Sequence, residues 1–465
     1  KELGDTPFYR PSEDSEEMQY LAERRRALGG FVPRRQVRAK AMAPLGEAVF
    51  EEFYKGSGAG REVATTMVMV RLLRHLMSHP KLGPLIVPIV PDEARTFGMD
   101  ALFRKHGIYS SLGQRYEPAD SDVVAYYRES KDGQLLEEGI TEAGSMSSFL
   151  AAGSAYATWG VNTVPFFVFY SMFGFQRVGD LIWQNADQRG RGFLVGATAG
   201  RTTLAGEGLQ HQDGHSHVLA SVVPTVKAYD PAYAYEIAII VRDGIRRMYE
   251  IGEDCFYYLT VQNEMYEMRG MPDGEEERAR IREGVLRGLY LLENLPSGAE
   301  SRPKVHLFGS SAILRSALRA REILQERGVA ATVWSVTSYL ELRREALATE
   351  RWNRLHPEET PRTPWVTSQL ESRPWPVIAV SDYMKVLPDQ LARFIPGGVV
   401  PLGTDGFGRS DERHALRRHF EVDAESVVVA ALAELARRGE VPASEVTRAM
   451  RDFQIDPEKV DPAIA

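Results

Sequence analysis

The stretch VPFFVFY at residues 164–170 decides the fold prediction, because seven consecutive residues are apolar or aromatic. A strand that is buried on one face alternates apolar and polar residues, whereas a strand that is buried on both faces is continuously apolar. Strands of the second kind belong to parallel sheets that helices cover on both sides. The stretch therefore predicts a central strand of an α/β domain.

Similar apolar runs surround this stretch, and helix-like segments separate them. Residues 61–79, REVATTMVMVRLLRHLMSH, carry apolar residues at the helical period, and Pro80 lies just beyond their end. Alternation of strands and helices predicts a mostly parallel sheet flanked by helices. The further strands that we expect in this domain are LIVPIV (85–90), GFLVGAT (192–198), IAIIVRDGIRRMYE (237–250) and CFYYLT (255–260).

A second α/β unit follows. Residues 304–328, KVHLFGSSAILRSALRAREILQERG, have the pattern of a strand, a glycine turn and a helix. Residues 331–338, 376–384 and 399–411 continue with strand-like runs, and residues 425–439 predict a late helix. The predicted organisation is a polar arm or linker at 1–50, one domain at 51–270, a linker at 271–295 and a second domain at 296–465.

Composition excludes several classes of protein. The 465-residue chain has a formal net charge of −8 and no basic stripe, which argues against a nucleic-acid partner. No apolar run reaches the length of a membrane span. Cys255 is the only cysteine in the sequence, and it favours a buried thiol in a reducing compartment. We therefore expect a cytoplasmic protein that binds neither nucleic acid nor membranes.

Two polar stretches follow predicted buried segments. Asp92 and Glu93 come directly after the strand at 85–90, where α/β sheets bind ligands, although two acids there can also only cap the next helix. Glu142 precedes a run of small residues that suits a close-packed helix. A carboxyl in such a dry place can hold or donate a proton, or it can simply favour the start of the helix.

Two further stretches combine rings and polar groups. YSMFGFQRVGD (170–180) clusters aromatic residues before Arg177, and core packing alone would explain it. GEGLQHQDGHSH (206–217) contains His211, His215 and His217. Three histidines can bind zinc, so a zinc enzyme is an alternative, although their spacing fits no helix-based ligand motif.

Taken in order, the motifs resemble those of the homodimeric type of pyruvate dehydrogenase (acetyl-transferring). This thiamine-diphosphate-dependent enzyme is the decarboxylating component of the bacterial pyruvate dehydrogenase complex. The likeness runs from about Phe8 to the C-terminus. The motifs that carry it are DEARTFG (92–98), EGITE (138–142), YSMFGFQRVGD (170–180), RTTLAGEGLQHQDGHSH (201–217), AYDPAYAYE (228–236), SDYM (381–384) and LGTDGFGRSD (402–411).

The resemblance implies a transketolase-like α/β fold, with a thiamine-diphosphate pyrimidine-binding domain followed by a transketolase C-terminal-like domain. It implies oxidative decarboxylation of pyruvate and reductive acetyl transfer to the lipoyl group of the dihydrolipoyl acetyltransferase component, in a homodimer. The cofactors would be thiamine diphosphate and Mg²⁺. The family's G-D-G motif does not occur in this sequence, which begins at Lys1. We therefore expect the chain to be part of a longer polypeptide whose upstream half supplies the magnesium ligands.

For the cofactor, the resemblance implies roles for residues on the pyrimidine side of the site. Glu142 would hydrogen-bond the pyrimidine N1′ atom and favour the imino tautomer, and Phe173 would stack on the ring. Ile140 would support the bent cofactor from below. Tyr170 and Arg177 would line the same site.

For the substrate, His211 would lie near the substrate-derived oxygen, where a histidine can donate and exchange a proton near neutral pH. Glu207 would orient the histidine loop. Asp92 and Glu93 would form an acidic pair near the cofactor and the substrate channel. Two departures from the most readily compared family member are Gln212, which stands where that member has an acid, and Ala205, which stands where it has an asparagine.

Three alternatives stay open at this point. The chain could belong to another thiamine enzyme of the transketolase group, such as 2-oxoglutarate dehydrogenase or transketolase. It could be the zinc enzyme described above. It could also be a non-catalytic α/β interaction module.

Overall fold

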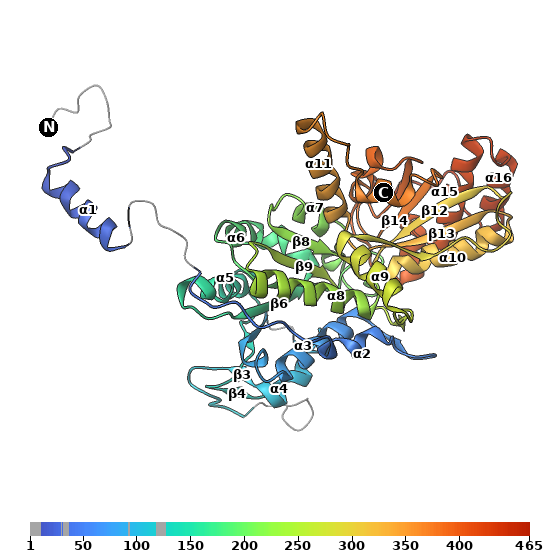
Figure 1. Ribbon diagram of the computed structural model, residues 1–465. Coiled ribbons are helices and arrows are strands. Elements are labelled where there is room, and N and C mark those ends of the chain that lie inside the picture. The colour runs from blue at the N-terminus through green and yellow to red at the C-terminus, as the bar shows by residue number, and fades with distance from the viewer. Residues whose placement is uncertain (1–10, 29, 31–36, 92–93, 118–126) are drawn as a thin grey trace, which may run out of the picture. The chain divides into compact units, whose positions relative to one another are not determined.

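The computed structural model describes residues 11–28, 30, 37–91, 94–117 and 127–465 (Figure 1). Contacts divide the chain into two units, 1–40 with 155–162, and 41–154 with 163–465. In the first unit, helix α1 (Glu16–Ala27) begins with two glutamates and ends with three arginines, a distribution that suits the helix dipole. Further along the arm, the backbone N–H groups of Arg38 and Ala39 donate to the carbonyl of Tyr156 at 3.2 and 3.0 Å.

The second unit contains both α/β domains. Its first sheet has six strands in the order β5-β2-β6-β7-β9-β8, and every neighbouring pair is parallel. The stretch at 164–170 forms β6 in the interior of this sheet, which confirms the prediction of a strand buried on both faces. The strands are β2 (Ile86–Val90), β5 (Leu136–Glu137), β6 (Val164–Tyr170), β7 (Phe193–Ala197), β8 (Val226–Tyr229) and β9 (Phe256–Thr260).

One predicted strand is wrong. Residues 237–250 form most of helix α8 (Ala234–Ile245) and the π-helical turn after it (Arg246–Ile251). Every residue of α8 except Arg242 is buried, because helices α2, α3 and α9 surround it while Gly244 packs on the ring of Phe193 in β7. A helix that is covered on all sides is apolar all round, so its sequence cannot be distinguished from a buried strand by continuous apolarity.

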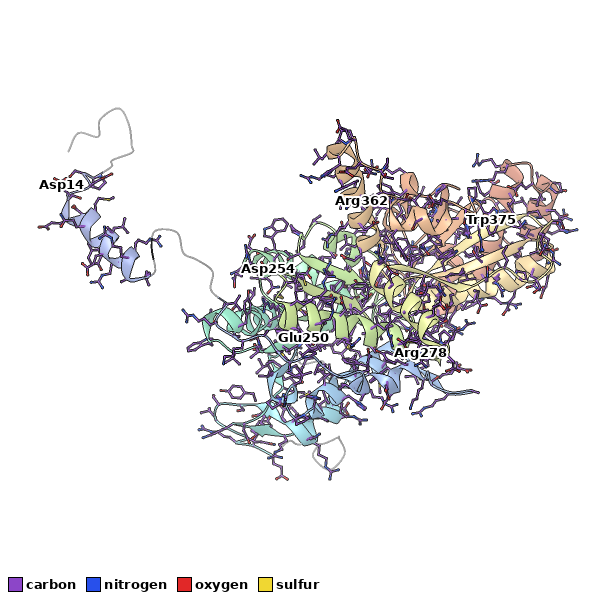
Figure 2. All side chains as sticks on the ribbon, in the orientation of Figure 1. Asp14, Glu250, Asp254, Arg278, Arg362 and Trp375 are labelled. Carbon is purple, nitrogen blue, oxygen red and sulfur yellow. The ribbon has the colours of Figure 1, made fainter. Side chains whose placement is uncertain are left out.

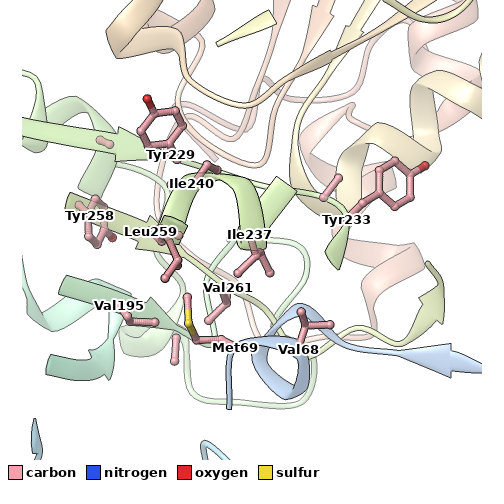
Figure 3. Packing of buried hydrophobic residues seen from close by; sticks show 14 of the residues in the cluster. Val68, Met69, Val195, Tyr229, Tyr233, Ile237, Ile240, Tyr258, Leu259 and Val261 are labelled. Carbon is pink, nitrogen blue, oxygen red and sulfur yellow. The ribbon is translucent and has the colours of Figure 1, made fainter. Parts of the chain in front are cut away.

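The predicted helix at 61–79 is confirmed as α3, and it completes the core of the first domain. Figure 3 shows Val68 and Met69 of α3 beneath Ile237 of α8, close to Val195 of β7 and Leu259 of β9. The helices of this domain are α2 (Glu51–Tyr54), α3 (Thr65–Ser78), α4 (Asp100–His106), α5 (Glu142–Thr158), α6 (Phe175–Asp187), α7 (Ser216–Ala220) and α8. Two small sheets pair β1 (Glu62–Val63) with β10 (Tyr266–Glu267) and β3 (Ile108–Tyr109) with β4 (Glu129–Ser130).

The second sheet has the order β11-β13-β12-β14-β15, and only the edge strand β11 runs antiparallel to its neighbour. The four predicted strand segments of this domain are confirmed. The region 271–295, predicted as a linker, contains helix α9 and strand β11, so part of it belongs to this sheet. The strands are β11 (Leu289–Glu293), β12 (Lys304–Gly309), β13 (Ala330–Val336), β14 (Val377–Val380) and β15 (Val399–Leu402).

Helices cover both faces of the second sheet. Helices α10 and α15 contact each other and the sheet on one side, while α11 and α12 enclose a separate apolar cluster with it. In the described parts of the chain, no helix combines the length and apolarity that crossing a membrane requires. The helices are α9 (Glu275–Arg287), α10 (Leu314–Glu326), α11 (Tyr339–Leu355), α12 (Trp365–Leu370), α13 (Val386–Asp389), α14 (Arg413–Phe420), α15 (Ala424–Arg437) and α16 (Ala443–Asp452).

Two buried carboxyl groups of the first domain are hydrogen-bonded by the second. Asp230 follows β8 and accepts hydrogen bonds from Thr260 Oγ1 and Ser310 Oγ, both at 2.7 Å. Glu236 accepts hydrogen bonds from Tyr290 and Ser335 at 2.6 and 2.8 Å. Burial raises the pKa of Asp230 to about 7 and also raises the pKa of Glu236. Through these hydrogen bonds, Asp230 and Glu236 of the motif AYDPAYAYE connect the first domain to the second.

His306 in β12 is a buried imidazole in the second sheet. Its Nε2 atom lies 2.9 Å from the Arg373 carbonyl, so this nitrogen carries the proton. Nδ1 then accepts hydrogen bonds from Thr332 and from Trp334 Nε1, at 2.7 and 3.2 Å. The ring also packs 5.0 Å from that of Trp375, which Figure 2 labels. Burial lowers the pKa of His306 to about 4.

This environment predicts a pH-dependent loss of stability. The unfolded chain binds a proton at His306 below about pH 6.5, whereas the folded chain does so only near the lowered pKa of about 4. The stability that the neutral ring contributes is therefore complete above pH 6.5 and is lost as the pH falls towards 4. Between pH 7 and pH 4.5, urea denaturation should show wild type losing about 2 kcal/mol more than His306→Gln. Equal losses in both proteins would contradict the assignment.

Candidate functional site

The carboxyl ends of three adjacent strands create the site. Strands β5, β2 and β6 are parallel neighbours, so the residues that follow them emerge at the same edge of the sheet. Ile140 and Glu142 follow β5, and Tyr170 is the last residue of β6. Asp92 and Glu93 follow β2, but they lie outside the described residues.

Glu142 is the first residue of α5 and is only 7 % exposed. Thr141 Oγ1 accepts a hydrogen bond from the backbone N–H of Gly144 at 3.1 Å, which fixes the start of the helix. Glu142 Oε2 accepts a hydrogen bond from Arg177 Nη1 at 2.9 Å. Within the described part of the chain, Oε1 of Glu142 makes no hydrogen bond, so it is able to accept one from a ligand.

A tight turn after β6 brings Phe173 and Arg177 to this carboxylate. Residues Ser171–Phe173 form a short 3₁₀ helix, and Gly174 then leads into α6. A Cβ atom at Gly174 would overlap the ring of Phe169, so the turn requires glycine there. The guanidinium carbon of Arg177 lies 4.1 Å from the centre of the Phe173 ring and covers one face of it.

The aromatic rings continue to the histidine loop, residues 206–217. Tyr170 stacks on His211 with ring centres 4.7 Å apart and an interplanar angle of 17°. The ring centre of Phe173 lies 5.3 Å from that of His211 and 6.0 Å from that of Tyr170, and both contacts are edge-on. The structure therefore brings together three separate stretches of the sequence, which contribute Glu142, then Tyr170, Phe173 and Arg177, and finally His211.

The His211 side chain has capacity to bind a proton or a ligand. Its Nδ1 atom lies 3.4 Å from Glu207 Oε2, and this buried nitrogen has no hydrogen-bond partner among the described residues. Glu207 lies beside the imidazole, and its role in orienting the histidine loop stays a prediction. A carboxylate with one oxygen able to accept, aromatic rings and a half-buried imidazole can bind a flat heterocycle and exchange protons with it or its substrate.

Ile140 has a different environment. Its side chain is 79 % exposed, although it is large and apolar. It makes no part of the hydrophobic core of the described residues, but it lies two positions before Glu142 at the same edge of the sheet. Its exposure leaves the apolar side chain available to a ligand or partner at this edge.

The three histidines of the loop point to separate partners. His215 Nε2 pairs with Gln176 at 2.5 Å, and His217 Nε2 pairs with Thr260 at 2.9 Å, while His211 stacks on Tyr170. In the part of the chain that the structure describes, no group of three His, Cys, Asp or Glu side chains could hold a metal ion. The zinc alternative therefore has no ligand set among these residues.

His217 is a neutral structural residue. Burial lowers its pKa to about 4. Thr260 donates its hydroxyl proton to Asp230, so it accepts the proton of His217 Nε2. The imidazole thus binds the histidine loop to the end of β9.

The thiol of Cys255 is unreactive, because burial raises its pKa to about 12.

The structure adds residues that the sequence did not indicate. Asp382, in the SDYM motif of the second domain, accepts hydrogen bonds from the backbone and hydroxyl of Thr202 at 2.8 and 2.6 Å and from Thr203 at 2.5 Å. Glu264 of the first domain is paired with Arg315 and Arg417 of the second. The motifs were visible in the sequence, but their partners lie up to about 180 positions away.

Family models match both α/β domains. The model described as "Pyruvate dehydrogenase E1 component middle domain" matches residues 43–269, and "Transketolase-like TK C-terminal domain" matches residues 288–423. The first match contains Glu142, Arg177 and His211 together with the aromatic rings around them.

Similar curated proteins cover almost the entire chain. A pyruvate dehydrogenase E1 component of Pseudomonas aeruginosa is 52 % identical over 463 residues, which are 99 % of this chain and 52 % of the relative. One of Escherichia coli K12 is 47 % identical over 468 residues, 99 % of this chain and 51 % of the relative. The chain thus spans about half the length of the curated relatives it matches.

Solved structures share the fold at low identity. A transketolase from Leishmania mexicana matches with a TM-score of 0.58 and 16 % identity, covering 82 % of this chain and 47 % of the other. A transketolase from Pichia stipitis matches with a TM-score of 0.59 and 13 % identity, covering 84 % and 48 %. These matches confirm the predicted transketolase-like fold. The chain belongs to the pyruvate dehydrogenase E1 component family, and it comprises the middle and transketolase-like C-terminal domains of that family.

Proposed function

We propose that this chain forms the pyrimidine-binding half of a thiamine-diphosphate site for the oxidative decarboxylation of pyruvate. The acetyl group would then pass reductively to the lipoyl group of a dihydrolipoyl acetyltransferase, which makes the complete enzyme a pyruvate dehydrogenase (acetyl-transferring). The observation that carries the proposal is the cluster of Glu142, Phe173, Tyr170 and His211 at one edge of a transketolase-like sheet. Membership of the E1 family supports the same reaction.

The residues on this edge fit the aminopyrimidine of the cofactor. When bound, thiamine diphosphate supplies the nucleophilic carbon and the electron sink that decarboxylation of a 2-oxo acid needs. Oε1 of Glu142 is able to pair with a ring nitrogen while Oε2 stays bound to Arg177. Stacking would use the face of Phe173 that Arg177 does not cover, and Ile140 would lie against the cofactor.

On the substrate side, His211 is placed to handle protons. Its position against Tyr170 and Phe173 limits rotation of the ring, and Glu207 can stabilise the charged imidazolium. A histidine held this way can donate a proton to an oxygen of the substrate and take it back later. Asp92 and Glu93 remain candidates for the substrate channel on sequence grounds.

The remaining parts of the proposal concern the complete enzyme. We propose a cytoplasmic homodimer whose upstream half carries the Mg²⁺ ligands and holds the diphosphate. The single cysteine, with its inert thiol, agrees with a reducing compartment.

Substrate choice is the direct test. The complete enzyme that contains this chain, loaded with thiamine diphosphate and Mg²⁺, should reduce ferricyanide with pyruvate at least about 100-fold more efficiently than with 2-oxoglutarate, measured as kcat/KM. Pyruvate lacks the second carboxylate of 2-oxoglutarate, and Arg177, which could bind such a group, is already paired with Glu142. A preference for 2-oxoglutarate would overturn the choice of substrate.

Glu142→Gln tests the pyrimidine contact. The amide keeps the shape and the bond to Arg177 but cannot act as a charged acceptor towards the ring, so kcat should fall by about 100-fold or more. Glu138→Gln is the matched control, because Glu138 precedes α5 and hydrogen-bonds Ser148 instead. Circular dichroism should be unchanged in both variants. Near-normal turnover of Glu142→Gln would refute the proposed role.

His211→Ala tests the substrate side. We expect kcat/KM for pyruvate to fall by about 100-fold, whereas the Kd for thiamine diphosphate, measured by calorimetry, should change little. His215→Ala is the control on the same loop, since His215 contacts Gln176 outside the ring cluster. Equal losses of cofactor affinity and turnover would indicate that the loop had simply lost its fold.

A further inference from the structure

The second domain contacts the histidine loop through the SDYM segment, where the Met384 N–H donates to the Gly214 carbonyl at 2.8 Å, and through a glycine-rich loop, residues 403–411. The sequence GTDGFGRSD gives it no phosphate-binding pattern, and the proposed function uses none of its residues. In the structure this loop is hydrogen-bonded to residues 201–217 at several points. The backbone N–H of Gly206, for example, donates to the Asp411 carbonyl at 3.2 Å.

Gln212 is at the centre of these contacts and adjoins His211 in the chain. Its side chain is buried, with 1 % exposure. Nε2 donates to the Leu204 carbonyl at 3.1 Å, and Oε1 accepts from the backbone N–H of Arg409 at 2.6 Å. The Gln212 amide therefore binds the segment that leads into the histidine loop, at Leu204, and also binds the second domain, at Arg409.

Arg201 makes further hydrogen bonds across the same junction. Its guanidinium is buried and donates to the backbone carbonyls of Thr404 and Gly406, the latter at 2.6 Å. Gly214 leaves room for this side chain, because a Cβ there would lie 2.5 Å from the guanidinium carbon. The two loops are thus packed too closely to shift independently.

Gly408 shows how close the approach is on the side of the second domain. A Cβ atom at this position would lie 2.8 Å from the Leu209 carbonyl and 3.0 Å from Gln212 Oε1. Leu209 and His211 are the two ends of one 3₁₀ turn, so a shift of Leu209 would move the imidazole as well.

We propose that Gln212 is a positioning residue that holds His211 against Tyr170 by tying the histidine loop to the 403–411 loop of the second domain. The C-terminal domain thereby acts on the reaction without contacting substrate or cofactor. This inference rests on the proposed proton-transfer role of His211. It predicts that Gln212 matters only while His211 is present.

The physical reason is geometric. Without the amide, the Arg409 N–H and the Leu204 carbonyl lose their partner, and the loop can adopt other conformations to satisfy them. An imidazole that is displaced by about 1 Å can lose about 100-fold in rate. A carboxylate at position 212 would still accept from Arg409 but could not donate to Leu204.

The test is a double-mutant cycle in the complete enzyme with pyruvate. Gln212→Ala should lower kcat by about 10- to 100-fold, while the Kd for thiamine diphosphate stays unchanged. Adding it to His211→Ala should cost nothing further, because the residue acts through the imidazole. Gln212→Glu keeps only the bond to Arg409 and should therefore recover part of the rate, and Gln210→Ala, an exposed glutamine on the same loop, is the control.

The outcomes separate two kinds of failure. Losses of Gln212→Ala and His211→Ala that multiply in the double variant would overturn the positioning role, as would full activity of Gln212→Ala. If His211→Ala itself retains full activity, the proposed function of His211 fails instead.

Gly408→Ala provides a second measurement from the other domain, which also serves if Gln212→Ala does not fold. It should lower kcat in the presence of His211 and have no effect in its absence. A Gly408→Ala loss that persists in the His211→Ala background would contradict the proposal.

Discussion

The parallel alignment of β5, β2 and β6 is the constraint on which the site depends. Because the three strands run in the same direction side by side, the segments that leave them share one edge of the sheet. Glu142 and Tyr170 meet there, and the turn forced by Gly174 returns Arg177 to the carboxylate. An antiparallel neighbour would have sent one of these segments to the opposite edge.

The second domain completes this edge through side chains that are buried at the junction. Asp382 holds Thr202 and Thr203, Arg201 reaches the carbonyls of the 403–411 loop, and Gln212 binds Arg409. The residues closest to the chemistry therefore belong to the first domain, whereas the conformation of their loop depends on both. A C-terminal domain to which no ligand-binding residue is assigned can still determine how well the site is ordered.

The sequence predicted the fold where local pattern and packing agree. The strand at 164–170 is apolar because both faces are covered, but the run at 237–250 is apolar because α8 is enclosed on all sides, and local pattern cannot separate these cases. The short strand β8 carries Lys227 and was not predicted. The resemblance indicated the cluster around Glu142 and His211. It could not indicate the bond of Gln212 to Arg409, which joins residues 197 positions apart and involves a backbone group.

The carboxyl of Glu236 connects the two domains by hydrogen bonds. It accepts hydrogen bonds from its own helix start at Ala232 and Tyr233 and, at the same time, from Tyr290 and Ser335 across the junction. Separating the sheets would leave a buried acid with half of its partners. The two domains are therefore expected to melt in one cooperative transition, and a chain nicked between them would remain a single particle.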